Sequence, residues 1–346
     1  ETIVCIMEGI SDENVSSNIL PVNEVEYSFA LFFIKPHAVN PEVENFVDDF
    51  LKSFNITIVS KGKKTNKDTD EIIDKHYGVL AKRALLIPPQ DFLFSTPPSE
   101  KVVKNFETLF GKTLSDALAD NSLMNLSRAK SEYLQDFTFE QIEKMWRKGE
   151  SVKLFPGTYV AAVEHNKTET PIYVINGFYG SMREKFTSDA NAPEGVSWRL
   201  LRWKASWISW KDFRESIVGV TDPTKAKTDS LRGILFSRFK ELGLIKQPAG
   251  ADNGFHASAS PLEASHERCI WLGNQLSNDE FVKYCIEHYG KLTQESFDQF
   301  CLNPMVASRN GGKQTKLFDL VENMNPSECA KALSNIDIIA LTQLNK

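Results

Sequence analysis

The sequence predicts a globular fold of mixed helices and strands, because segments with the two-residue period of strands alternate with segments that have the spacing of helices. Residues 27–36 and 55–65 have the pattern of strands, and residues 41–54 and 68–78 have the pattern of helices. In chain order these segments give strand, helix, strand, helix. The hydrophobic content of 41% is that of an ordinary soluble globular protein, so we expect a substantial core.

The first strand and helix have clear boundaries. Residues 27–36 (YSFALFFIKP) are mostly apolar until Pro36, which cannot donate to a sheet. Asn40 then supplies an N-cap, and Pro41 takes the first helical position. The apolar residues that come next recur at helical spacing: Val43, Phe46, Val47, Phe50, Leu51 and Phe54. The second strand (NITIVSKGKKT) alternates in polarity, and the second helix (DTDEIIDKHYG) should end at Gly78.

Residues 86 to about 170 have a different character. Four prolines frame a loop, and helix-like segments come after it, one with Thr138 and Gln141 spaced as a capping box. Two strand-like runs, 157–165 and 171–177, end this part. The prolines are Pro88, Pro89, Pro97 and Pro98.

The remainder again alternates. A helix at 177–186, a strand at 196–203 and a helix at 209–219 lead into a long loop, 220–233. From about 274 to 346 we expect a helical C-terminal extension. Its first helix should begin at a capping box of Ser277 and Glu280 and end near Gly290.

Composition excludes several classes of function. The net charge of −6 argues against a general surface for nucleic acid, so a phosphate site must be a local cluster of cations. The longest apolar run, Phe29 to Ile34, is too short to span a membrane. The acidic N-terminal stretch lacks the pattern of a secretory signal. Five cysteines at wide spacings indicate reduced thiols rather than a metal site or a disulfide framework. We therefore expect a cytoplasmic protein.

Two fragments that suggest a phosphate-binding loop fail on spacing. FGKT at 110–113 has Phe106 where the motif requires glycine, and GGKQT at 311–315 has Gln314 after the lysine. Dinucleotide, zinc-protease and hydrolase-elbow motifs do not occur either. What remains is a dispersed set of short motifs in a fixed order.

These motifs are KPxxV at 35–39, HY at 76–77, TDP at 221–223, LRG at 231–233 and NxxHxS at 253–258. In this order they resemble the nucleoside diphosphate kinase family, over roughly 27–80 and 175–273. The resemblance implies an α+β fold, with a ferredoxin-like domain at 27–273, an N-terminal extension at 1–26 and a large mixed insertion at about 86–170. It also implies nucleoside tri- and diphosphates as partners, Mg²⁺ as cofactor, and a phosphohistidine as the intermediate.

The resemblance assigns roles residue by residue. His256 is the nucleophile, and Ser258 and Glu267 steady it. Tyr77 lies near His256 and Lys35. The remaining residues would bind the nucleotide: Lys35, Thr221 and Arg232 the phosphates, Asn253 the ribose and phosphates, and Phe178 and Met182 the base. Phe178 takes the stacking role only if the family helix resumes after the insertion. A neutral imidazole is a competent nucleophile near pH 7, which supports this assignment from chemistry alone.

Some positions depart from the family pattern. The family arginine before TDP is Glu215 here, with Arg214 as its neighbour, and the aspartate after the histidine is Ala259. A shift of one helical residue turns a side chain by about 100°, so whether Arg214 or Glu215 faces the phosphates decides how competent the site is. These departures, with an enlarged loop after Arg232, favour an alternative. That alternative is a weakly active or inactive nucleotide-binding scaffold, for example in a cytoskeletal or flagellar assembly, and homo-oligomer assembly stays open.

Overall fold

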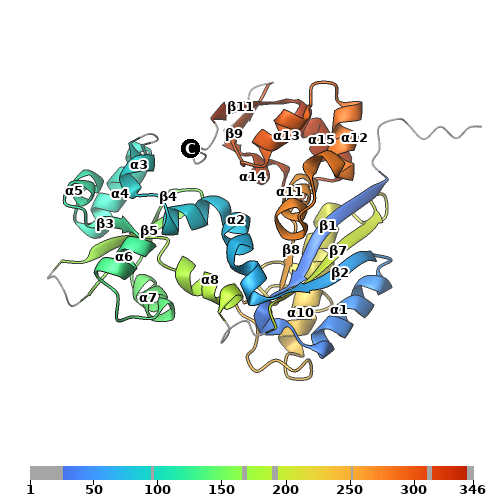
Figure 1. The fold of residues 1–346 in the computed structure, drawn as a ribbon, viewed down its shortest axis with the longest axis horizontal. Coiled ribbons are helices and arrows are strands. Elements are labelled where there is room, and N and C mark those ends of the chain that lie inside the picture. Colours follow the sequence, from blue (N-terminus) through green and yellow to red (C-terminus); the bar gives the residue numbers. More distant parts are fainter. Residues whose placement is uncertain are drawn as a thin grey trace, which may run out of the picture.

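The computed structural model describes residues 26–94, 97–165, 170–188, 194–250, 252–309 and 314–340. Three groups of elements are visible in Figure 1: a central sheet with its helices, an inserted part at the left, and a C-terminal part at the top right. The expectations for the N-terminal extension, apart from Glu26, lie outside the described residues, as does most of GGKQT.

The central sheet has four strands in the order β2-β7-β1-β8, and each neighbouring pair is antiparallel. The strands are β1 (Tyr27–Ile34), β2 (Thr57–Lys64), β7 (Val196–Lys204) and β8 (Phe255–Ala257). Its antiparallel pairing and its helices give an α+β fold, in agreement with the sequence. β1 is a central strand and is almost wholly buried, which is why its sequence is a nearly continuous apolar run.

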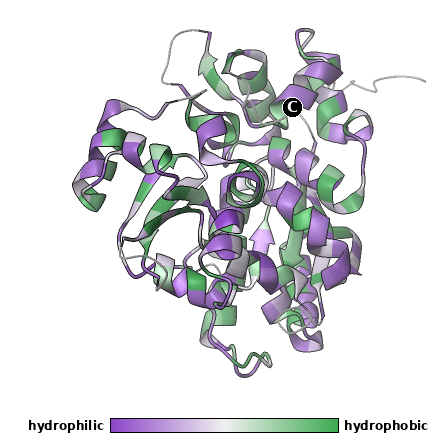
Figure 2. Cartoon of the chain, turned by 60° about the vertical axis from the view of Figure 1, so that its left-hand side comes forward, coloured by the Kyte–Doolittle hydropathy of each residue, from purple (hydrophilic) through white to green (hydrophobic). Residues whose placement is uncertain are grey.

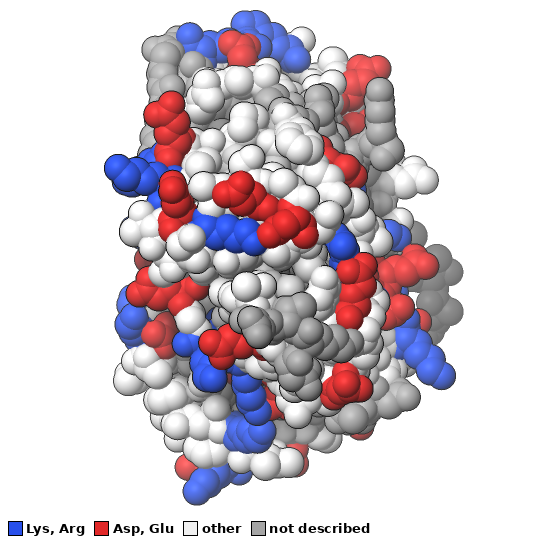
Figure 3. Space-filling model, turned by 90° about the vertical axis from the view of Figure 1, so that its left-hand side faces the viewer, with Lys and Arg blue, Asp and Glu red and all other residues white. Residues whose placement is uncertain are grey.

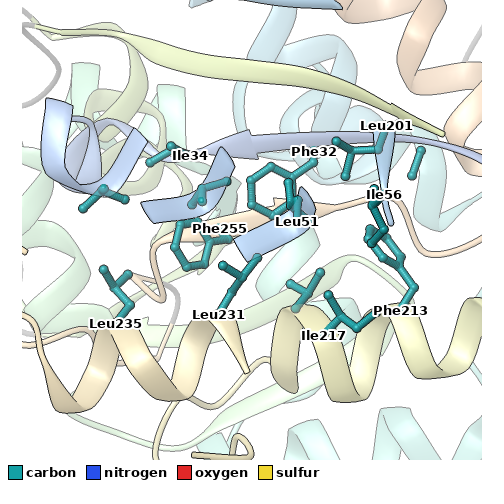
Figure 4. Close-up of a cluster of buried hydrophobic side chains, with 14 of the residues drawn as sticks. Phe32, Ile34, Leu51, Ile56, Leu201, Phe213, Ile217, Leu231, Leu235 and Phe255 are labelled. Carbon is teal, nitrogen blue, oxygen red and sulfur yellow. The ribbon is translucent and has the colours of Figure 1, made fainter. Parts of the chain in front are cut away.

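Alternation along β1 assigns its side chains to two faces of this sheet. Phe32, Ile34 and Phe255 belong to a large hydrophobic cluster under one face (Figure 4). Leu31 and Phe33 belong to a second cluster on the other face. The first face is covered by α1 (Pro41–Ser53), α9 (Trp210–Asp212), η2 (Phe213–Gly219) and α10 (Leu231–Ser237). The second is covered by α2 (Asn66–Leu85), α8 (Tyr179–Thr187) and α11 (Pro261–Leu272).

Local signals placed several helix ends correctly. Asn40 accepts a hydrogen bond from Val43 N and caps α1, with Pro41 in the first turn. The regular helix predicted at 68–78 does stop at Gly78, but a further helical segment of α2 follows it. The helix continues to Leu85 across a kink at Gly78 (φ 45°, ψ −108°), a conformation that glycine adopts without steric cost. This kink directs the second half of α2 into the inserted part.

The inserted part has its own mixed sheet, in the order β3-β6-β5-β4. Strand β6 (Ile172–Ile175) is integral to this sheet, so the inserted unit continues past residue 170. The capping box of Thr138 and Gln141 is present at α7. The other elements are η1 (Pro36–Ala38), before the insertion, and α3 (Pro89–Leu93), α4 (Glu100–Phe110), α5 (Leu114–Ala119), β3 (Leu123–Asn125), α6 (Leu126–Glu132), α7 (Phe139–Trp146), β4 (Ser151–Phe155) and β5 (Thr158–Val163) within it.

The C-terminal extension is not purely helical, contrary to expectation, because it contains a small sheet in the order β10-β9-β11. Its helix α12 is capped by Asp279, which accepts from Phe281 N and Val282 N, rather than by Ser277. Its strands are too short for their alternation to stand out in the sequence. The elements are η3 (Leu276–Asn278), α12 (Glu280–His288), α13 (Gln294–Phe300), β9 (Met305–Ser308), β10 (Thr315–Lys316), α14 (Leu317–Val321), α15 (Pro326–Ser334) and β11 (Ile336–Ala340).

Charges of both signs are mixed on the surface (Figure 3), and four cysteines are free thiols. Hydrophobic residues concentrate in the strands and on one side of many helices (Figure 2). Acidic and basic side chains are interspersed on the face shown in Figure 3, without a large area of one sign. Cys269, Cys285, Cys301 and Cys329 are free thiols, and Cys5 lies outside the described residues. Within the described ranges, every helix is too short or too polar to cross a bilayer.

A buried ion pair fastens the extension to the central sheet. Arg268 on α11 donates to Asp279 from both Nε (2.9 Å) and a terminal nitrogen, and to Phe29 O on β1 (3.0 Å). Both side chains are 2% exposed. Removing one partner of such a pair leaves the other charge buried without compensation.

We therefore expect Asp279→Asn to lower the free energy of unfolding by about 3 kcal/mol in chemical denaturation. Glu280→Gln changes the neighbouring exposed carboxylate and should have almost no effect. Equal effects of the two substitutions would show that the ion pair does not fasten the extension.

Candidate active site

His256 lies on β8 directly opposite Phe33 of β1, on the sheet face covered by α2, α8 and α11. The two rings are stacked, with centroids 4.5 Å apart and an interplanar angle of 20°. His76 of α2 meets the His256 ring edge-on, at 4.8 Å and 84°. The imidazole is therefore held between two rings, and its side chain remains 20% exposed.

Glu267 fixes one nitrogen of this imidazole. Its Oε1 lies 2.7 Å from His256 Nε2, and its Oε2 accepts from the Ser258 hydroxyl at 2.6 Å. Ser258 Oγ also accepts from Leu31 N at 3.0 Å, which ties this group to β1. Glu267 is 2% exposed, so the carboxylate is held inside the protein by these bonds. The sequence prediction that Ser258 and Glu267 accompany His256 agrees with this geometry.

Electrostatics set the tautomer of His256. Burial raises the pKa of Glu267, but the His256 ring, His76 and the Ser258 hydroxyl together lower it below the usual value. Glu267 is therefore a carboxylate at neutral pH and accepts the Nε2 proton. This leaves Nδ1 with its lone pair and, among the described residues, without a hydrogen bond. In a neutral imidazole, the nitrogen that carries no proton is the one able to act as a nucleophile.

His76 is a member of this group that the sequence analysis did not assign. Trp271 Nε1 donates to His76 Nδ1 at 3.2 Å, and Glu267 Oε1 lies 3.6 Å from the same nitrogen. Burial, and then the neighbouring His256, lower the pKa of His76 to about 3. The available signal was its position beside Tyr77 in the HY pair, on a helix that packs over the face bearing His256.

A second group of hydrogen bonds lies beside the start of β8 and joins Lys35, Asn253 and Thr221. Lys35 Nζ donates to Asn253 Oδ1 at 2.9 Å, and Asn253 Nδ2 donates to Thr221 O at 2.9 Å. Lys35 N also donates to Gly254 O at 2.8 Å, which continues the pairing of β1 with β8. Burial, and then Arg232, lower the pKa of Lys35 to about 8. Three residues that are distant in sequence are thus brought together, with Thr221 taking part through its backbone oxygen.

Arg232 joins the same region from the first turn of α10, which Ser230 caps. Its terminal nitrogens donate to Gly219 O and, at 2.8 Å, to Phe255 O, the residue before His256. Its Nε is buried and has no partner among the described residues. Burial, and then Arg214, lower the pKa of Arg232 to about 10. The described part of the site therefore holds a donor that is not saturated.

Lys185 and Asp252 were not predicted, although they belong to the same charged group. They form an ion pair at 2.9 Å that connects α8 with the segment before β8. The charges of Arg232 and Lys185 lower the pKa of Lys35, whereas the charge of Asp252 raises it. The region thus contains three close cations and one carboxylate. In the sequence, Lys185 is an ordinary lysine on a helix and gives no signal.

Other predicted residues lie elsewhere or have other partners. The Phe178 ring packs against three side chains of the inserted part. Its centroid lies 5.2 Å from that of Trp146, 6.2 Å from that of Tyr159 and 5.5 Å from the Arg147 guanidinium carbon. Met182 packs in the same hydrophobic cluster. Since the sequence did not show how the insertion folds back on α8, these contacts were not expected.

Tyr77 lies beside the site on α2. Its ring is 5.0 Å from that of His76 and 6.2 Å from that of Tyr179. Burial, and then the carboxylates of Glu267 and Asp252, raise the pKa of Tyr77 to about 12. Its phenol is therefore a neutral donor near the imidazole at physiological pH.

Arg214 is turned toward the C-terminal extension. It donates to Glu322 Oε1 at 2.6 Å and to Asn323 Oδ1 at 2.7 Å. The helix at this point has π geometry, so the angle expected for an α-helix does not apply. Glu215, the other residue in question, is partly buried and forms no ion pair among the described residues.

One group could supply ligands to a metal ion. His76, His256 and Glu267 each offer an atom, and the three atoms lie within 4.8 Å of one another. Two imidazole nitrogens suit a transition metal better than Mg²⁺, which prefers oxygen, and Trp271 already donates to His76 Nδ1. Asp252 is the carboxylate nearest to the cations. The donor set therefore fits Mg²⁺ only if substrate phosphates and water complete its coordination.

Comparisons with known proteins add little to this geometry. No protein-family model matches the chain, and no curated protein matches it in sequence. Among solved structures, an NDP kinase from Pyrobaculum aerophilum is similar at 16% sequence identity with a TM-score of 0.30. The match covers 71% of this chain and 95% of that chain. At this TM-score the likeness carries no weight for the fold or the function of the chain.

The low pKa of His76 makes stability depend on pH. The unfolded chain takes up a proton at this histidine near pH 6.5, whereas the folded protein does so only near pH 3. The free energy of unfolding therefore falls as the pH is lowered through this window, by roughly 2 kcal/mol between pH 7 and pH 5. His76→Gln should reduce this fall in urea titrations at several pH values. His288→Gln, at an exposed position of α12, should change it much less, and equal slopes in wild type and His76→Gln would contradict the assignment.

Proposed function

We propose that this chain transfers the γ-phosphoryl group of a nucleoside triphosphate to a nucleoside diphosphate through a phosphohistidine at His256. The observation that carries the proposal is the His256–Glu267 hydrogen bond, which occupies Nε2 and leaves Nδ1 as the nucleophile. We further propose that the central sheet is a ferredoxin-like domain. The order β2-β7-β1-β8, with α1 after β1 and α9 to α10 after β7, is the connectivity of that fold.

The transfer requires two displacements. In the first, the Nδ1 lone pair of His256 forms a bond to the γ-phosphorus, and the bond from that phosphorus to the bridging oxygen breaks. The nucleoside diphosphate leaves with the bonding electrons. In the second, a terminal oxygen of another diphosphate attacks the phosphorus and the P–N bond breaks. Glu267 stabilises the cationic ring of the intermediate, because its carboxylate stays bound to Nε2–H.

The remaining residues would neutralise and orient the phosphates. Lys35 and the Thr221 hydroxyl would be the donors in this role, Arg232 would contribute its positive charge, and Asn253 positions Lys35 through its side-chain oxygen. Mg²⁺ would be held on the phosphate oxygens, where it supplies positive charge. Phosphoryl transfer requires mainly positioning and neutralisation of charge, so this small set is sufficient.

The alternative is a nucleotide-binding scaffold with weak or no activity. The specific observation that favours it is the engagement of Arg214 by Glu322 and Asn323, which holds a guanidinium away from the phosphates. The packing of Phe178 in the inserted part points the same way, because that ring is already contacted by three side chains.

Incubation with γ-labelled ATP and Mg²⁺ separates the two functions. We expect a phosphoprotein that is stable in alkali and labile in acid, and that loses its label to added nucleoside diphosphate. His256→Ala should abolish the label, and Lys35→Ala should slow labelling by about 100-fold. His288→Ala, at a surface histidine of α12, should label as the wild type does.

If the protein is a nucleotide-binding scaffold, we expect no phosphoprotein. The wild type would then bind nucleotide, measured by fluorescence titration, and would carry no label. Label of equal intensity on wild type and His256→Ala would overturn the assignment of the nucleophile, because the phosphoryl group would then be on another residue.

A further inference from the structure

A cavity of about 800 Å³ adjoins the His256 site and is lined in part by α2 and α11. Its lining comes from four places: the kink of α2, the Pro156–Gly157 turn of the inserted part, α11, and the C-terminal extension around Leu302 and Phe318. His76 and Glu267 contribute to its wall, whereas Lys35, Arg232 and Asn253 do not. The cavity is therefore separate from the proposed phosphate site. Its volume is that of a pocket for a small organic molecule.

Much of the wall is apolar. Side chains from the two halves of α2, from α11 and from the extension supply it, so that a hydrophobic ligand would be enclosed from several directions. They are Tyr77, Val79, Leu80, Leu85, Leu86, Ile270, Leu302 and Phe318.

The acidic side chains of the wall differ in their partners. Glu71 pairs with Lys75 at 3.4 Å, and Asp74 pairs with Arg183 at 3.0 Å. Glu267 is bound to His256 and Ser258. Asp319 is exposed to water. Glu263 is the remaining acid, and it is partly buried.

Glu263 has no cation of its own among the described residues. Its carboxylate accepts only from Ala259 N, and Glu267 and Glu322 lie near it. Arg214 is the nearby guanidinium, but it is bound to Glu322 and Asn323. Burial, and then the Glu267 charge, raise the pKa of Glu263 above its usual value. A cation placed here would relieve the repulsion between these carboxylates.

The lysines of the wall do not provide it. Lys75, Lys82 and Lys316 line the cavity, and none of them forms an ion pair with Glu263. Lys75 is paired with Glu71, and Lys316 donates to Asn303 O at 3.1 Å. We propose that this cavity is a binding site for an organic amine, whose ammonium group pairs with Glu263 and whose apolar body lies against Leu80, Ile270 and Phe318. The site depends on no step of the proposed phosphoryl transfer, so it can exist even if that function fails.

Binding also moves a proton. Because burial and the Glu267 charge favour the protonated form of Glu263, an ammonium ion that pairs with it ionises the carboxyl group, and the proton passes to the buffer. The amount released is measurable by calorimetry in buffers with different enthalpies of ionisation. A neutral ligand of the same shape releases none.

The experiment compares 2-phenylethylamine with 2-phenylethanol, which has the same ring and chain but no charge. Isothermal titration calorimetry on the full chain should show tighter binding of the amine to the wild type, with proton release. Glu263→Gln should weaken the amine at least tenfold and leave the alcohol unchanged. Asp319→Asn, which alters an exposed acid of the same wall, should leave both affinities unchanged.

A second variant keeps the test independent of folding. Leu302→Trp fills the cavity from the extension and should abolish binding of both compounds, while circular dichroism verifies that each variant is folded. Equal affinity of the amine for wild type and Glu263→Gln would overturn the proposal. So would an amine that binds no tighter than the alcohol, or binding of both that survives Leu302→Trp.

Discussion

The hydrogen bond between His256 Nε2 and Glu267 Oε1, 2.7 Å long, is the interaction on which the account of this protein depends. It needs a buried carboxylate, and a buried carboxylate needs further partners to stay charged. Ser258 and the backbone of Leu31 supply them, so β1, β8 and α11 must be in register before the imidazole is oriented. The orientation of the His256 ring therefore depends on the correct pairing of β1 with β8 and on the packing of α11.

The second constraint is that both faces of this sheet are buried. Residues of β1 alternate between two hydrophobic clusters, and a shift by one residue would exchange them. Phe32 and Phe33 fix the register from opposite sides, and Phe33 also stacks on His256. The contacts that stabilise the fold therefore also orient the imidazole. They lie in the central sheet, whereas the inserted part begins beyond the kink at Gly78.

Sequence patterns predicted local features, and the order of the short motifs predicted which residues lie near one another. The cap at Asn40 is a local feature, and the association of His256 with Ser258 and Glu267 is such a grouping. Patterns could not predict contacts between distant segments, such as Arg214 with Glu322 or Phe178 with the inserted part, because each depends on how another unit docks. His76 had no spacing relation to other histidines, and it becomes significant only when α2 lies over β8. Roles beyond these positions stay predictions.

The central claim is that Glu267 holds His256 with Nδ1 free to react. The most direct test is the position of the phosphoryl group on the ring, determined by ¹⁵N and ³¹P NMR of protein labelled with ¹⁵N-histidine and incubated with ATP and Mg²⁺. The account predicts a phosphorus–nitrogen bond at Nδ1 of His256, with Nε2 still protonated. A bond at Nε2, or at a different histidine, would contradict it.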